Sequence, residues 1–321
     1  MFVRQFYFSW SILFQFYSSF NIINARNIPN NKIRITREIK SPNDVTINDI
    51  IAYMQKYGHL EAAKQKDEAG GDAPIDQNTI LKNGIKRLQK YMGIKQTGEP
   101  DKETKKAILL PRCGINQNTG NKWEDNKRNL TFAIYDFHPK LDKDLQRLAI
   151  RTAFNRWASV STFKFHDVTE ISDITPDIKV GFFSDCHGDK DCFDGELQVL
   201  AHGYYPEDGH LHFDLDENWA YPNSAAIRTD ISTGKYIDLL EIATHEIGHI
   251  LGVEHIPNTE AIMSPGYNPK NDSSGNYIVK KLHALDIEKV QELYGVGTEG
   301  SSRGPPILSN RKRRETTSSV S

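Results

Sequence analysis

Three histidines with metal-ligand spacing, His245, His249 and His255, are the residues of this chain best suited to chemistry. On a helix, His245 and His249 lie one turn apart on the same face, so their imidazoles can bind one metal ion. Gly252 allows the backbone to leave that helix through a positive φ and to bring His255 back to the same ion. Three neutral imidazoles leave one open position on a tetrahedral zinc, which is typical of catalytic rather than structural sites.

Glu246 follows the first of these histidines and is expected to be the catalytic base. Its carboxylate cannot easily share the ion with His245, but it can take a proton from water at the open position, whose pKa falls to about 7. The pattern is H-E-x-x-H, an established zinc-binding motif. The alternative is an ordinary amphipathic helix with hydrogen-bonded histidines, and the additional His255 argues against it.

A second group of possible metal ligands precedes the first. It combines three imidazoles with one carboxylate, a closed tetrahedral set suited to a structural zinc: His187, Asp189, His202 and His212. Three carboxylates are interleaved with this group or follow it, and such hard oxygen ligands suit calcium: Asp194, Asp214 and Glu217. The alternative is a solvated loop rich in His and Asp, because the zinc ligands are spread over 26 residues.

Composition favours a secreted globular protein. The 321 residues suffice for two modest domains, and 40 basic against 42 acidic residues do not suggest a nucleic-acid partner. Residues 6–20 are apolar and rich in aromatic side chains, so 1–25 is expected to be a signal peptide, with a membrane anchor as the alternative. Cys186 and Cys192 are close in sequence and are expected to form a disulfide, which leaves Cys113 unpaired.

The elements that must position these residues suggest an α+β architecture in two parts. Three short helices are expected first, at residues 47–60, 80–92 and 102–109. Strands are expected next, at residues 130–135, 163–165, 178–182, 197–205 and 211–213. Longer helices are expected at residues 144–159, 236–251 and 282–293, so the metal-binding helix comes late. Residues 297–321 are rich in Ser, Gly, Pro and Arg and are expected to form a disordered basic tail.

Two further segments complete a resemblance to the matrix metalloproteinases of the metzincin clan. The segment A-I-M-S-P-G-Y at 261–267 resembles the family's Met-turn, which would place Met263 beneath the zinc and Pro265 and Tyr267 on the specificity-pocket wall. The segment P-R-C-G around Cys113 resembles the cysteine switch of the family's inhibitory propeptide. The resemblance runs from about residue 47 to residue 295, and no hemopexin-like repeats follow, as in minimal family members.

The resemblance implies a three-helix propeptide at 26–120 and a metzincin-type catalytic domain, with a mixed twisted sheet and long helices, at 121–296. Cys113 would be the fourth ligand of the catalytic zinc until the propeptide is removed. The implied function is that of a secreted, extracellular zinc endopeptidase made as a latent zymogen. Its expected partners are extracellular matrix proteins as substrates and the family's proteinaceous inhibitors, and neither nucleic acid nor a transmembrane anchor is expected.

The resemblance also assigns ligands and substrate contacts. It supports the structural-zinc set and adds carbonyl ligands to the calcium site: Gly195, Leu197 and Val199. Asp177 matches a ligand of a second calcium site. Substrate is expected to pair with an edge strand at Leu200 and Ala201. Glu241 lies one helical turn before His245, so it either points away from the specificity pocket or makes that pocket shorter and more polar.

Two other functions are considered. A catalytically silent zinc protein could serve as a binding module, but an intact Glu246 argues against it. Residues 85–108 are similar to peptidoglycan-binding-like modules, which would suit a hydrolase targeted to cell walls. The adjoining switch segment favours an inhibitory propeptide instead. The basic run R-K-R-R at 311–314 is either a protease-processing site or part of a solvated tail.

Overall fold

The structure is a computed structural model that describes residues 41–60, 65–66, 72–73, 76–115, 121–189 and 191–297. These residues belong to one compact unit of the chain, Glu38–Ser321. The expected signal peptide at 1–25, the end of the expected propeptide at 116–120 and the basic run at 311–314 lie outside the described residues. Within the described part, every helix is too short or too polar to cross a lipid bilayer.

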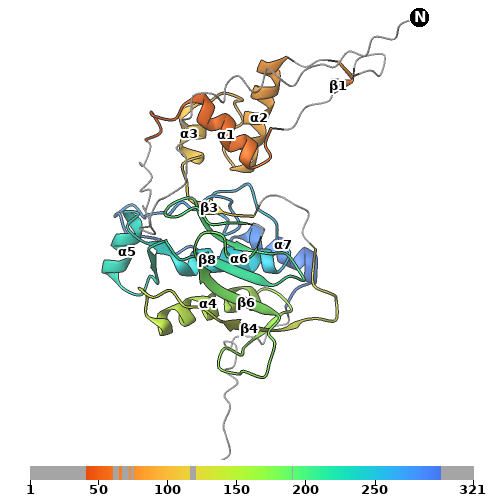
Figure 1. The fold of residues 1–321 in the computed structure, drawn as a ribbon, viewed down its shortest axis with the longest axis vertical. Coiled ribbons are helices and arrows are strands. Elements are labelled where there is room, and N and C mark those ends of the chain that lie inside the picture. The colour runs from red at the N-terminus through yellow and green to blue at the C-terminus, as the bar shows by residue number, and fades with distance from the viewer. Residues whose placement is uncertain are drawn as a thin grey trace, which may run out of the picture. The chain divides into compact units, whose positions relative to one another are not determined.

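The first described part is a small helical group (Figure 1). It contains α1 (Ile47–Lys56), α2 (Gln77–Tyr91) and α3 (Lys102–Ala107), together with a two-stranded antiparallel ribbon of β1 (Gln65–Lys66) and β2 (Asp72–Ala73). Buried Ile50, Met54 and Leu88 are part of its core. Helix α1 ends earlier than expected because Gly58 has a φ of 72°, and the next residue bonds back to the Met54 carbonyl.

The second part is built on a six-stranded sheet. Its strands are β3 (Arg112–Cys113), β4 (Asn129–Ile134), β5 (Lys164–Asp167), β6 (Ile178–Phe183), β7 (Val199–Gly203) and β8 (His210–Asp214). Their order across the sheet is β3-β7-β8-β6-β4-β5, and every pair is parallel except β7 with β8. β7 starts later than expected because Leu197 has a φ of 63°, which interrupts an extended chain.

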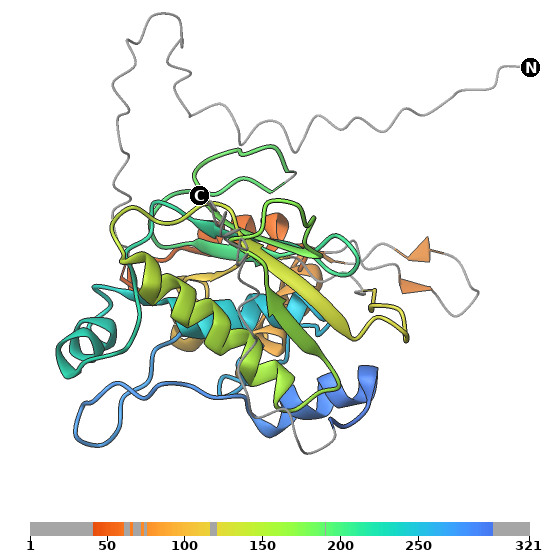
Figure 2. The same ribbon diagram turned by 90° about the horizontal axis from the view of Figure 1, so that it is seen from below.

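Helices α4 (Lys143–Ala158) and α6 (Leu239–Ile250) pack against each other and against the sheet, and α7 (Ala284–Tyr294) follows at the end of the described chain (Figure 2). The Trp157 indole N–H donates to the Thr244 carbonyl at 2.7 Å, which ties the two long helices together. Gly248 leaves room for this contact, since a Cβ there would lie 2.9 Å from the Trp157 ring. The observed mixed sheet with helices confirms the expected α+β class.

Further elements differ from the sequence-based expectation. The metal-binding helix begins at Leu239 rather than at 236, because the Asp238 carboxylate caps it by accepting the N–H groups of Leu240 and Glu241. The residues before it form β10 (Ile237–Asp238), which pairs in parallel with β9 (Trp219–Ala220), and neither strand was expected. Helix α5 (Ala225–Ser232) was not expected either, and only Ile231 in it is buried.

Candidate active site

The three histidines of the zinc motif converge as their spacing predicts. His245 and His249 lie on one face of α6. The helix ends at Ile250, and Gly252 just beyond it has a φ of 84°. A Cβ at Gly252 would lie 2.7 Å from the Asn121 carbonyl oxygen. The chain turns there and returns His255, so that the three Nε2 atoms lie 3.1 to 3.2 Å from one another. Nitrogen ligands of a tetrahedral zinc lie about 3.3–3.4 Å apart, so the set fits that ion.

The ring nitrogens that face away from the metal position, the Nδ1 atoms, also support a zinc site. The Nδ1 atom of His245 lies 2.7 Å from the Ile262 carbonyl oxygen, and that of His249 lies 2.8 Å from the Val253 carbonyl oxygen. A carbonyl only accepts, so both Nδ1 atoms carry the proton and both Nε2 lone pairs face inward. Burial lowers the pKa of His245 to about 4 and that of His249 further, which keeps the rings neutral. Facing lone pairs of neutral imidazoles require a cation between them.

Cys113 lies at the position that the three histidines leave open. Its Sγ atom and the three imidazole nitrogens all lie within 4.8 Å of one another. Two neighbours approach the sulfur, the Glu246 carboxylate at 3.4 Å and the Ile115 N–H at 3.4 Å. Burial, and then the nearby carboxylate, raise the pKa of the Cys113 thiol. The charge of a bound zinc opposes both effects and favours the thiolate.

Glu246 lies in a closed environment between the helix and the edge of the sheet. It is 1% exposed, and burial raises the pKa of its carboxyl group to about 8. Gly203 at the end of β7 lies against the same residue, since a Cβ there would be 2.5 Å from the Glu246 carbonyl oxygen. Strand and helix are therefore in backbone contact, which holds Glu246 beside the metal ligands.

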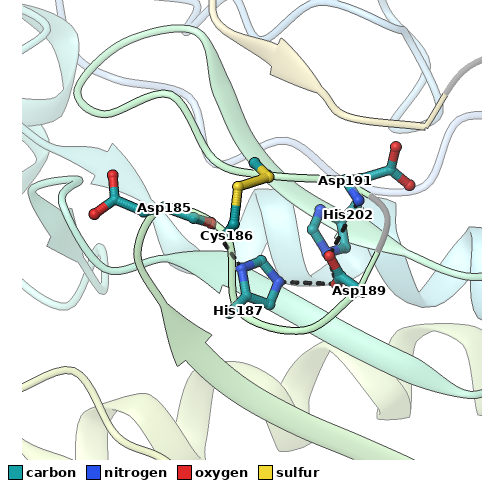
Figure 3. The surroundings of a disulfide bond; sticks show 7 residues. Asp185, Cys186, His187, Asp189, Asp191 and His202 are labelled. Atoms are coloured by element: carbon teal, nitrogen blue, oxygen red, sulfur yellow. Dashed lines mark hydrogen bonds and ion pairs between the residues drawn. A yellow bond between two sulfur atoms is a disulfide. The ribbon is translucent and has the colours of Figure 1, made fainter. Parts of the chain in front are cut away.

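The second ligand group also converges. Asp189 Oδ2 lies 2.8 Å from His187 Nε2, 2.9 Å from His202 Nε2 and 2.8 Å from His212 Nδ1. His187 Nδ1 lies 2.9 Å from a backbone carbonyl oxygen and so presents its Nε2 lone pair inward. Figure 3 shows the two labelled imidazoles, His187 and His202, pointing toward Asp189. The donor set and its spacing fit a tetrahedral zinc.

A disulfide between Cys186 and Cys192 lies beside this group (Figure 3). It closes a short loop that contains His187 and Asp189. Cys113 is the free, buried cysteine of the chain.

The expected calcium ligands come from two segments: the turn at 194–199 that leads into β7, and residues 214–217 at the end of β8. Val199 donates its N–H to Asp194 at 3.1 Å, and Leu197 donates its N–H to Glu217 at 2.6 Å. The Asp214 Oδ2 atom is buried and has no hydrogen-bond partner among the described residues. Burial and the neighbouring carboxylates raise the pKa of Asp214 to about 7 and that of Glu217 to about 8. An orphaned oxygen among repelling carboxylates fits a hard cation such as calcium. Gly195, whose carbonyl was expected to be a ligand, lies on this turn with a φ of 83°.

The expected second calcium ligand, Asp177, has other partners. One oxygen accepts from the N–H and the hydroxyl of Thr131 at 2.8 and 2.9 Å, and the other lies 3.0 Å from the Lys127 ammonium. Asp177 is thus paired with a lysine, as Asp194 of the first calcium group is with Lys56 at 3.3 Å, and its role in a second calcium site stays a prediction.

A narrow pocket opens beside the catalytic ligands. Its lining includes four of the five residues that were expected to contact substrate, Leu200, Glu241, Pro265 and Tyr267. The predicted metal ligands Cys113 and His245 and the predicted base Glu246 also line it. Ala201 does not line it, but accepts the Gly114 N–H at 2.8 Å on the strand edge. Met263 is fully buried and is not among the lining residues of this pocket. It lies in a turn whose Met263 and Ile262 N–H groups donate to Asp286.

Glu241 lines this pocket and is 4% exposed. Its carboxylate accepts a hydrogen bond from the Tyr277 hydroxyl at 3.1 Å and lies 3.4 Å from the Lys280 ammonium. These contacts favour the second orientation considered from the sequence, in which Glu241 makes the pocket more polar. Tyr277 and Lys280 were not identified from the sequence, because neither belongs to a motif and both follow Glu241 by more than 30 residues.

Comparison with known proteins agrees with this geometry. Residues 122–295 match the family model for matrixin. The chain is 37% identical over 261 residues to matrix metalloproteinase-C of Caenorhabditis elegans, covering 79% of this chain and 44% of that protein. It is 34% identical to metalloendoproteinase 4-MMP of Arabidopsis thaliana, and the match covers 78% of this chain and 73% of that protein. It is 31% identical to human neutrophil collagenase, and the match covers 81% of this chain and 51% of that protein. The chain therefore spans about half the length of some of its relatives. The chain therefore belongs to the matrixin family of zinc-dependent metalloendopeptidases.

Proposed function

We propose that this protein is a secreted, latent zinc endopeptidase in which Glu246 is the general base and Cys113 blocks the catalytic metal. The proposed organisation is a signal peptide at 1–25, an inhibitory propeptide at 26–120, a catalytic domain at 121–296 and a basic tail at 297–321. The observation that carries the proposal is the Cys113 sulfur, which lies among the three convergent imidazoles and 3.4 Å from Glu246.

The latent form is supported by how the switch segment lies on the catalytic domain. The Arg112 N–H donates to the Gln198 carbonyl at 2.6 Å, and Gly114 donates to Ala201, so β3 occupies the edge of β7 where substrate would pair. The helical part also contacts this domain closely, because a Cβ at Gly93 would lie 2.7 Å from the Pro257 backbone. These contacts favour an inhibitory propeptide over an independent wall-binding module.

In the proposed mechanism, removal of the propeptide frees both the β7 edge and the metal. His245, His249 and His255 would hold the catalytic zinc, which would supply a Lewis acid for the scissile carbonyl and for water. The substrate backbone pairs with Leu200 on β7, and the side chain after the scissile bond enters the pocket. Glu246 takes a proton from the attacking water and later gives it to the leaving amine. The remaining ligand groups are proposed to hold a structural zinc and one calcium, which fix the loops beside β7.

We propose extracellular proteins, including matrix proteins, as substrates, and the family's protein inhibitors as partners. The first experiment compares peptide hydrolysis by the propeptide-free enzyme with that of Glu246→Gln. Loss of the general base is expected to lower kcat about 10²–10⁴-fold while the zinc content is unchanged. Glu254→Gln is the matched control, because this exposed glutamate lies next to His255 but outside the pocket. Near-normal turnover by metal-replete Glu246→Gln would show that Glu246 is not the base.

A further inference from the structure

The cysteine switch contains a buried cation that is held by tyrosines. Arg112 is 3% exposed. Its guanidinium donates to the hydroxyl groups of Tyr53 at 2.8 Å and Tyr91 at 3.2 Å, and its Nε–H donates to the Cys113 carbonyl at 3.0 Å. The guanidinium carbon also lies 3.6 Å from the centre of the Tyr57 ring, a cation–π contact. Among the described residues, no carboxylate forms an ion pair with Arg112.

One of these tyrosines also contacts the catalytic ligands. The Tyr91 hydroxyl lies 2.9 Å from His255 Nδ1, and both side chains are buried. A guanidinium only donates, so Tyr91 accepts from Arg112 with one lone pair. His255 Nε2 faces the metal position and must be unprotonated to bind zinc, so its Nδ1 carries the proton and Tyr91 accepts it with the second lone pair.

This partner differs in origin from those of the other two zinc ligands. His245 and His249 donate to carbonyl groups at Ile262 and Val253, which belong to the proposed catalytic domain. His255 instead donates to a side chain of α2, in the proposed propeptide. Propeptide removal would leave the first two hydrogen bonds intact and delete the third.

We infer that Tyr91 is a positioning residue for the catalytic zinc that only the latent form possesses: it orients His255 and slows release of the metal from the zymogen. The inference rests on the proposed zinc site. Partners behind a zinc-ligating histidine fix its ring orientation and raise its basicity, and their loss typically weakens metal binding about 10–100-fold. The Tyr91 contact should therefore add to the contribution of the Cys113 thiolate in the intact chain.

The test measures metal retention by the full-length zymogen loaded with cobalt(II). A thiolate-to-cobalt charge-transfer absorption reports the catalytic site alone, because the other zinc set contains no sulfur. Its decay after addition of a chelator, in excess calcium, gives the rate of metal loss. Tyr91→Phe is expected to speed that loss about 10–100-fold. Tyr53→Phe is the matched control, since it deletes the same kind of Arg112–hydroxyl bond but does not contact His255.

The outcomes separate this inference from the proposed function. Equal rates for Tyr91→Phe and Tyr53→Phe would overturn the role of Tyr91 while leaving the zinc site in place. A wild-type zymogen without the charge-transfer absorption would instead overturn the proposed site itself. Should Tyr91→Phe fail to fold, the wild-type zymogen with ¹⁵N-labelled histidine decides. Its His255 Nδ1–H is expected to be protected from exchange before propeptide removal and unprotected afterwards, and an unprotected proton in the zymogen would overturn the inference.

Discussion

Replacing Glu241 by leucine is expected to change the substrate preference of the activated enzyme. The Glu241 carboxylate lines the pocket, accepts from Tyr277 at 3.1 Å and lies 3.4 Å from the Lys280 ammonium. A leucine there converts one polar wall into an apolar one. A small change in how well a substrate side chain fills an apolar pocket alters transition-state binding by about 1–3 kcal/mol, which corresponds to about 10–200-fold in kcat/KM. The kcat/KM for peptides with leucine after the scissile bond should rise by that factor relative to the kcat/KM for peptides with a polar residue there.

The same substitution leaves Lys280 without its buried partner. Breaking a buried ion pair from one side costs about 3–5 kcal/mol of unfolding free energy, and we expect about 3 kcal/mol because 12% of the Lys280 side chain reaches solvent. Glu241→Leu combined with Lys280→Met removes both charges, so most of that loss should be recovered. Urea denaturation of the single and double variants measures the stability, and digestion of a peptide library measures the preference.

The double variant makes the test decisive, because it separates folding from specificity. A stably folded double variant whose preference after the scissile bond equals that of the wild type would place Glu241 outside the substrate pocket. An equal loss of stability in both variants would show that Lys280 does not depend on Glu241.

Three further results are expected. Full-length Cys113→Ser should hydrolyse peptides without propeptide cleavage, because a hydroxyl is a poorer zinc ligand than a thiolate; a silent variant beside an active propeptide-free domain would refute the switch. Non-reducing peptide mapping of secreted protein should recover Cys186 linked to Cys192, and two free thiols there would contradict that pairing. Added calcium should raise the Tm, since saturation at 100 times the Kd contributes about 2.7 kcal/mol to the stability of the folded state. Asp214→Asn should abolish the rise in Tm with calcium, because it replaces the carboxylate whose Oδ2 atom has no hydrogen-bond partner among the described residues. A wild-type Tm that is independent of calcium would refute the calcium site.

Local spacing is what made much of the site predictable. His245 and His249 are four residues apart, and a helix places such residues on one face whatever surrounds it. Gly252 marks the end of that helix for an equally local reason, its positive φ. The strands that carry the second ligand group were predictable from short runs of β-forming residues.

Long-range partners were not predictable in this way. Tyr91 and His255 are 164 residues apart, and no feature of either neighbourhood indicates the other. The orientation of Glu241 depended on Lys280, which lies outside any helix or strand. Helix α5 escaped prediction because a single buried residue, Ile231, produces no periodic apolar stripe.

The place of β3 in the sheet has a consequence for handling the protein. With β3 in position, β7 is an interior strand, and all five of its residues are buried. Without β3, the uncharged run Val199–Gly203 becomes an open sheet edge with unpaired N–H and C=O groups, a template for pairing between molecules. The full-length chain is therefore the form expected to refold and concentrate without aggregation. The isolated catalytic segment should need a peptide laid along β7 to remain soluble at high concentration.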